Sequence, residues 1–198
     1  DFRTNKQKAF ADGVDLNGRA FSGSASGNVT EELVNVGKAL AGTVTDDVKG
    51  KIALVERGDI TFVEKVQNVA AKGAVGVLMY NTGTGNNFGQ ANGEVPAVAI
   101  TRAQGLELVE KLKNGPVTAT LDVDIERIEK TSYVVEAKLK PNKNKDTGQI
   151  VTIGAHHDSV ANGPGANDDA SGVAVTLELA RVLANKPTDT EIRFMTFG

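Results

Sequence analysis

Residues 48–81 read VKGKIALVERGDITFVEKVQNVAAKGAVGVLMYN, and this stretch decides the fold of the first part of the chain. KIALVERG (51–58) is a short β-rich run that ends at a glycine, and ITFVEKVQNVAAKGA (60–74) has apolar residues at helical spacing. VGVLMYN (75–81) is a continuous apolar run next to glycines, which is typical of a strand buried on both faces. Together the three runs predict a strand–helix–strand unit.

A second unit of similar size follows the Gly/Asn-rich loop 82–94. PAVAI (96–100) predicts a strand, RAQGLELVEKLKNG (102–115) a helix, and VTATLDVDIERI (117–128) another strand. The helix ends on a glycine with lysines in its last turn, as the helix dipole favours. We therefore expect a compact α/β domain of roughly a hundred residues in the middle of the chain.

Composition narrows the classes of function. Of the 198 residues, 40% are hydrophobic, and the chain carries a formal net charge of −3. The sequence shows no clustered basic face of the kind that nucleic-acid binding needs. No apolar run approaches the ~20 residues of a membrane span. Cysteine is absent, so any metal would have to be held by histidine and carboxylate groups.

The pattern changes after residue 129. SYVVEAKL (132–139) alternates between apolar and charged side chains, and IVTIGA (150–155) is a short apolar run. With a polar turn between them, the two runs predict an antiparallel hairpin. ASGVAVTLELARVLAN (170–185) predicts a helix with one apolar stripe, and TEIRFMTFG (190–198) predicts a further strand.

The stretch GAHHDSVANGPGANDD (154–169) holds the candidate site. His156 and Asp158 stand at the carboxyl end of a predicted strand and share one face of it, so the Asp158 carboxylate can accept a hydrogen bond from the ring nitrogen that His156 does not offer to a metal. A Gly/Pro loop then returns the chain at Asp168, where a carboxylate can bridge two metal ions. His157 faces the other way, and we expect it to be structural.

Residues 12–128 resemble a protease-associated (PA) domain, on the strength of the strand ending in Arg-Gly, the Phe-containing helix and the strand ending in Tyr-Asn within residues 48–81. Residues 129–198 resemble the M28 metallopeptidases, which are co-catalytic dizinc aminopeptidases. The expected fold is therefore an α/β PA-like domain inserted in an incomplete α/β/α zinc-peptidase domain with a mixed sheet. In that scheme residues 1–11 are the end of the N-terminal part of the peptidase domain.

The resemblance also implies roles for the site residues. His156 binds one zinc, Asp168 bridges both zincs of the site, and Asp158, the catalytic residue of the set, orients His156. The family pattern continues after a strand like IRFMTFG with a Glu pair, and its peptide bond after the bridging Asp is commonly cis.

The resulting expectation is that the parent protein is a secreted, monomeric zinc aminopeptidase that acts on peptides and has no membrane or nucleic-acid partner, and that this segment alone is inactive. One alternative is that the PA-like region is a peptide-binding or substrate-gating module beside a non-catalytic peptidase-like domain. Another is a metal-dependent phosphoesterase or amidohydrolase, which ranks lower because the two histidines of the chain are adjacent to each other.

Overall fold

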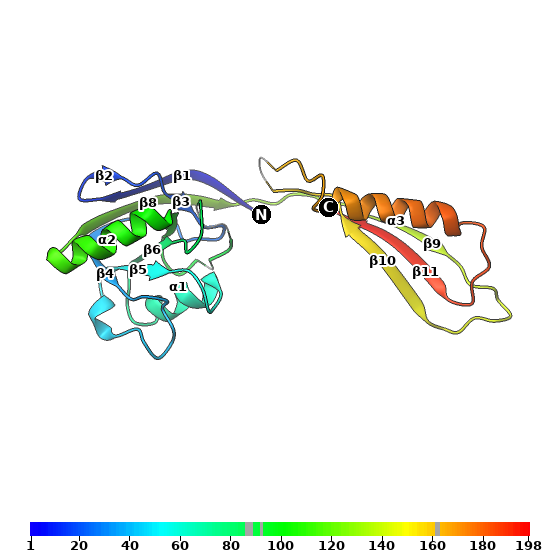
Figure 1. The fold of residues 1–198 in the computed structure, drawn as a ribbon, viewed down its shortest axis with the longest axis horizontal. Coiled ribbons are helices and arrows are strands. Elements are labelled where there is room, and N and C mark those ends of the chain that lie inside the picture. The colour runs from blue at the N-terminus through cyan, green and yellow to red at the C-terminus, as the bar shows by residue number, and fades with distance from the viewer. Residues whose placement is uncertain (86–88, 92, 161–162) are drawn as a thin grey trace. The chain divides into compact units, whose positions relative to one another are not determined.

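The computed structural model describes residues 1–85, 89–91, 93–160 and 163–198. The chain divides into two compact units, Asp1–Glu129 (unit 1) and Lys130–Gly198 (unit 2). Figure 1 shows the elements of each unit.

Unit 1 is built on a mixed sheet of eight strands in the order β2-β1-β8-β4-β5-β6-β7-β3. Strands β4 to β7 run parallel to one another, and β8 runs antiparallel to both β1 and β4. The strands are β1 (Phe2–Ala11), β2 (Val14–Asp15), β3 (Arg19–Ala20), β4 (Gly27–Asn35), β5 (Ile52–Glu56), β6 (Gly76–Tyr80), β7 (Ala97–Ile100) and β8 (Thr118–Arg127). The helices are η1 (Asp46–Val48, a single 3-10 turn), α1 (Phe62–Ala70) and α2 (Arg102–Asn114).

Strand β6 is buried on both faces, as its continuous apolar run predicted, and its neighbours β5 and β7 are buried in the same way. Alternate side chains enter two separate cores, because successive residues of a strand point to opposite faces. Leu54, Leu78 and Ile100 join the core that contains Leu108 of α2. The residues that alternate with these three along β5, β6 and β7 point to the opposite face and join the core that contains Val66 of α1. Each helix therefore covers one face of the same parallel strands.

Both helices start at a threonine that completes a capping box. Thr61 accepts a hydrogen bond from the backbone N–H of Glu64, whose side chain accepts one from the Thr61 backbone. Thr101 and Gln104 make the same reciprocal pair at α2. These bonds satisfy amide groups that have no partner inside the helix, so the starts of both helices are fixed where the strands before them end.

The first residues of the chain lie in unit 1, which differs from the expectation that 1–11 belong to the peptidase domain. Strand β1 pairs antiparallel with β8 from Phe2↔Arg127 to Ala11↔Ala119. Ala9 and Ala11 are buried in the core of the unit. Two small side chains on a mostly polar strand leave little trace in the sequence, and the pairing partner lies more than a hundred residues away.

Unit 2 is a three-stranded sheet in the order β10-β11-β9 with one helix. Its elements are β9 (Val134–Leu139), β10 (Ile150–His156), α3 (Ala170–Leu183) and β11 (Glu191–Phe197). Strand β11 lies between the other two, parallel to β10 and antiparallel to β9. The predicted hairpin of β9 with β10 is therefore wrong, because β11 occupies the place beside each of them.

Few side chains of unit 2 are buried. Among its described residues only Ala155, Thr176 and Phe194 are buried. The apolar face expected on β9 stays exposed, with Tyr133 and Val135 72% and 62% exposed. No helix in the described part of the chain is long and apolar enough to cross a membrane.

Because unit 1 buries many side chains and unit 2 few, we expect the two units to differ in how cooperatively each folds when produced alone. Residues 1–129 produced alone should unfold in urea in one cooperative transition, because their two cores are complete within the unit. Residues 130–198 alone should show a broad, weakly cooperative transition with a small m-value. Circular dichroism during urea titration measures both, and a sharp transition of residues 130–198 would contradict the interpretation.

At Gly105 of α2, packing and helix propensity predict opposite effects of a substitution by alanine. A Cβ at this position would overlap the buried ring of Tyr80. Gly105→Ala should therefore lower the free energy of unfolding by about 1–3 kcal/mol through overpacking, although alanine is the better helix former by about 1 kcal/mol. Chemical denaturation measures the change. Gly42→Ala is the matched control, since no atom lies within 4 Å of the new methyl group.

Candidate metal centre

The candidate site lies where β10 ends. His156 is the last residue of β10, Asp158 follows it, and Asp168 precedes α3 after the Gly/Pro loop. These three residues line an open pocket of about 450 Å³, together with residues 159–160 and 163–167. Residues 161–162 of the loop lie outside the described part of the chain.

The His156 ring is held between two carboxylates, as the spacing of the motif predicted. Its Nδ1 lies 3.1 Å from the Asp158 carboxylate and 3.1 Å from the Asp158 backbone carbonyl. Both of these groups accept, so Nδ1 carries the hydrogen and donates it. The neutral ring then has its lone pair on Nε2, which lies 3.0 Å from Oδ1 of Asp168.

The surroundings of the ring favour its protonated form. The pKa of His156 is raised above its ordinary value, first by the hydrogen bond to the Asp158 backbone carbonyl, while desolvation acts in the opposite direction. The hydrogen bond to Asp168 and the negative charges of Asp158 and Asp168 raise it further. The place between Nε2 and Asp168 therefore attracts a positive charge, and a proton and a metal cation would compete for it.

Asp169 also positions elements of the site, a role that the sequence did not predict. One of its carboxylate oxygens accepts a hydrogen bond from the backbone N–H of Gly172 and caps α3, at 3.2 Å. The other accepts from the backbone N–H of His156, also at 3.2 Å. The same side chain thus connects the start of α3 to the end of β10. An Asp directly before a predicted helix was the available signal, since aspartate is a preferred N-cap residue.

Glycine at position 172 is explained by this cap, because a Cβ there would overlap the Asp169 carboxylate. The peptide bond between Asp168 and Asp169 is cis, as the family resemblance implied.

The other histidine takes a different position. The backbone N–H of His157 donates to the carbonyl of Phe197 in β11, at 2.6 Å, and its ring lies against Gly198. Within the described residues, no group of three or more histidine, aspartate and glutamate side chains is arranged to hold a metal ion. The structure therefore brings together one imidazole and one carboxylate, with a second carboxylate behind the imidazole.

Two family models match the chain. Residues 29–108 match the PA domain, and residues 135–198 match Peptidase family M28. Both matches lie inside the regions that the resemblance assigned, and the two regions follow the same order along the chain.

Known proteins of the same kind cover nearly all of the sequence. Aminopeptidase YwaD of Bacillus subtilis (strain 168) is 40% identical over 195 residues, which is 94% of this chain and 41% of YwaD. The solved structure of an aminopeptidase from Aneurinibacillus sp. strain AM-1 covers 100% of this chain at 44% identity with a TM-score of 0.88, and the match takes in 50% of that protein. BSAP, a zinc aminopeptidase from Bacillus subtilis, covers 100% of this chain at 36% identity with a TM-score of 0.73, over 50% of that protein.

This chain therefore spans about half the length of the relatives that it matches, or slightly less. The matches agree with the α/β architecture of both units. Residues 135–198 of this chain are therefore a peptidase family M28 region, and a PA domain at residues 29–108 precedes them.

Proposed function

We propose that the protein to which this chain belongs is a zinc-dependent aminopeptidase that removes N-terminal residues from peptides. The observation that carries the proposal is the His156 ring, oriented by Asp158 on one side and facing Asp168 on the other. Further support comes from the names of the relatives, which are aminopeptidases, one of them described as a zinc enzyme.

The donor set suits zinc. An imidazole nitrogen and a carboxylate oxygen are common zinc ligands in proteins, and no thiolate is available in this chain. The Asp168 side chain is 88% exposed, so its second oxygen is open to a further cation. We assign His156 as the ligand of one zinc and Asp168 as the bridge between two.

Asp158 has the role of a positioning residue. By accepting the hydrogen of Nδ1, it keeps the ring in the tautomer whose Nε2 lone pair is free, and it fixes the direction of the ring. A zinc pair bound here would lower the pKa of a bound water and polarise the carbonyl group of the scissile bond. Asp158 makes the site more electron-rich without contacting the metal.

The 198-residue chain by itself should be inactive. A zinc ion takes about four ligands, and the described residues offer one imidazole and one carboxylate at this place. The rest of the relatives' length, about half, lies beyond the matched part and would have to supply the remaining ligands and a general base.

The proposed reaction can be tested on the full-length protein with aminoacyl chromogenic substrates. A chelator should abolish turnover and added zinc should restore it. Asp168→Asn should lower kcat by at least about a hundredfold and reduce the zinc content measured by atomic absorption, because an amide cannot replace the bridging charge. Asp189→Asn, which neutralises an exposed acid elsewhere in unit 2, is the control. Turnover that persists in the chelator would reject the proposal.

The role of Asp169 leads to a separate prediction. Asp169→Ala should cost about 1 kcal/mol of stability through loss of the helix cap. It should also weaken zinc binding about tenfold or more, because the backbone of His156 loses its tie to α3. Urea denaturation and competition with a metal indicator measure the two effects.

Asp169→Asn separates the effect on stability from the effect on zinc binding. The asparagine side-chain oxygen can still accept a hydrogen bond from the backbone N–H of Gly172, while its NH2 group cannot accept one from the backbone N–H of His156. It should keep most of the stability and still weaken zinc binding. Equal zinc affinity in all three proteins would contradict a positioning role for Asp169.

A further inference from the structure

A pocket in unit 1, far along the sequence from the metal-site motif, has the features of a binding site. Because β5, β6 and β7 are parallel and adjacent, the residues that follow them meet at one edge of the sheet. In open α/β sheets ligands bind at this edge. Here the loop after β6 and the start of α2 border an open surface pocket of about 470 Å³, lined by residues 82–85 and 101–103. That volume lies in the range of small-molecule sites.

One buried amide holds the loop that forms the pocket. Asn81 is 3% exposed, and its Nδ2 donates to the backbone carbonyls of Thr84 and Gly85, both at 3.2 Å. Its Oδ1 accepts from the backbone N–H groups of Thr82 and Gly83, at 2.9 and 3.3 Å. The loop is thus fixed before any ligand arrives, which reduces the entropic cost of binding.

The same bonds leave a donor on the loop. The Thr84 carbonyl points to Asn81, and in a trans peptide the N–H of Gly85 points the opposite way. No described residue accepts a hydrogen bond from that N–H. Gly83 and Gly85 both have open space where a side chain would begin, so the backbone of the loop is accessible.

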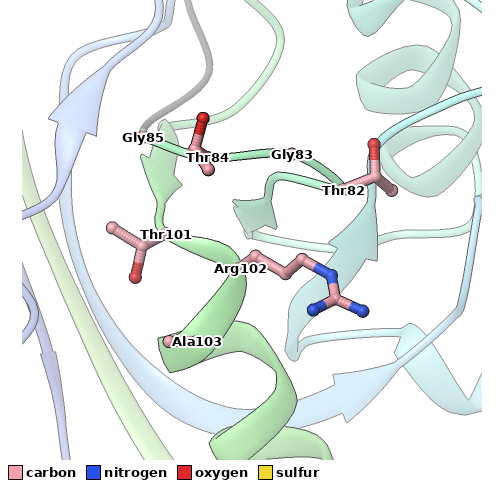
Figure 2. A pocket seen from close by; sticks show the side chains of 7 residues that line it. All are labelled: Thr82, Gly83, Thr84, Gly85, Thr101, Arg102 and Ala103. Carbon is pink, nitrogen blue, oxygen red and sulfur yellow. The ribbon is translucent and has the colours of Figure 1, made fainter.

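Arg102 is the charged group of the pocket. Figure 2 shows its side chain leaving the start of α2 on the side of Thr82, away from Thr101. The side chain is exposed, and within the described part of the chain it has neither a hydrogen bond nor an ion pair. The other residues that line the pocket are threonine, glycine and alanine, so its lining holds one positive charge and no negative charge.

Glu56, the last residue of β5, is a carboxylate at this edge of the sheet. It lies opposite Tyr80 of β6 in the strand pairing, and its charge acts on the Tyr80 phenol. The pKa of Tyr80 is raised first by burial and then by the charge of Glu56, while Arg102 acts in the opposite direction. Among the described residues Arg102 forms no ion pair with Glu56 or with any other carboxylate, so its guanidinium remains available to an incoming anion.

We propose that this pocket binds a carboxylate group of a peptide, with Arg102 as the anchoring residue and the Asn81-held loop as its second wall. A guanidinium presents a planar set of donors that matches the two oxygens of a carboxylate, and the loop adds a backbone donor. The choice of a peptide as the carrier rests on the proposed peptidase function. The pocket itself does not depend on the metal centre, and it gives the PA region a binding role of its own.

The test is an NMR titration of the ¹⁵N-labelled 198-residue chain in the presence of a chelator, which removes any contribution of the metal centre. The probes are the acetylated tripeptides Ala-Ala-Glu and Ala-Ala-Gln with amidated C-termini, and Ala-Ala-Ala with a free or an amidated C-terminus. Acetate and inorganic phosphate are added separately. The first pair of peptides tests a side-chain carboxylate, and the second pair tests a C-terminal one.

At least one carboxylate peptide should shift the amide signals of residues 82–85 and 101–103, while its neutral counterpart should not. Arg102→Gln should weaken that binding by at least about fivefold, and Arg102→Lys should weaken it less, since a lysine keeps the charge but not the planar pair of donors. Arg127→Gln is the matched control, because it removes the same charge from an exposed position at the end of β8. It should leave the affinity unchanged.

Equal binding by wild type and Arg102→Gln, or equal binding of the neutral peptides, would overturn the proposal. Tighter binding of phosphate would overturn the assignment to a carboxylate, and acetate binding as tightly as the peptides would overturn the assignment to a peptide. Since the chelator is present throughout and no turnover is measured, failure here leaves the zinc peptidase proposal intact. Failure of that proposal in turn leaves these shifts unaffected.

Discussion

Parallel pairing of neighbouring strands is the constraint on which both candidate sites depend. Two parallel strands end at the same edge of a sheet, so their backbone pairing alone brings together the residues that follow them. In unit 1 this places the loop after β6 beside the start of α2. In unit 2 the pair β10 and β11 ends at His156 and Phe197, and the site motif begins there. The helices then add the capping groups that fix each edge.

Local patterns were enough to predict much of the fold. The runs at 51–58 and 75–81 gave β5 and β6, and the helical spacing between them gave α1, because strands buried on both faces carry continuous apolar sequence. The order of strands was harder to predict. Strand β11 inserts between β9 and β10, and β1 pairs with β8, and neither choice is encoded within a few residues of the strands concerned. Pairing between distant segments depends on which edges remain free after the local units form.

The candidate site shows the same division. The placement of His156 and Asp158 could be predicted because a strand followed by His-x-Asp has a fixed geometry, and that of Asp168 because the Gly/Pro loop returns the chain there. The structure confirms that both carboxylates reach the ring. Asp169 was missed because its role depends on the place where α3 begins relative to the end of β10. Arg102 was missed for a similar reason. An exposed arginine has no sequence signature of its own, and only the arrangement of the loop that Asn81 holds makes it part of a pocket.

The pairing of β1 with β8 has a consequence for the order of events during synthesis. Phe2 lies opposite Arg127, so the sheet of unit 1 joins its first strand to its last. At roughly 5–20 residues per second, a ribosome needs on the order of ten seconds to deliver β8 after β1 has emerged. During that interval β1 and β4 both lack the strand that separates them in the finished sheet. The nascent chain therefore exposes two unpaired strand edges together, and this interval is when unit 1 is most open to aggregation and to chaperone binding.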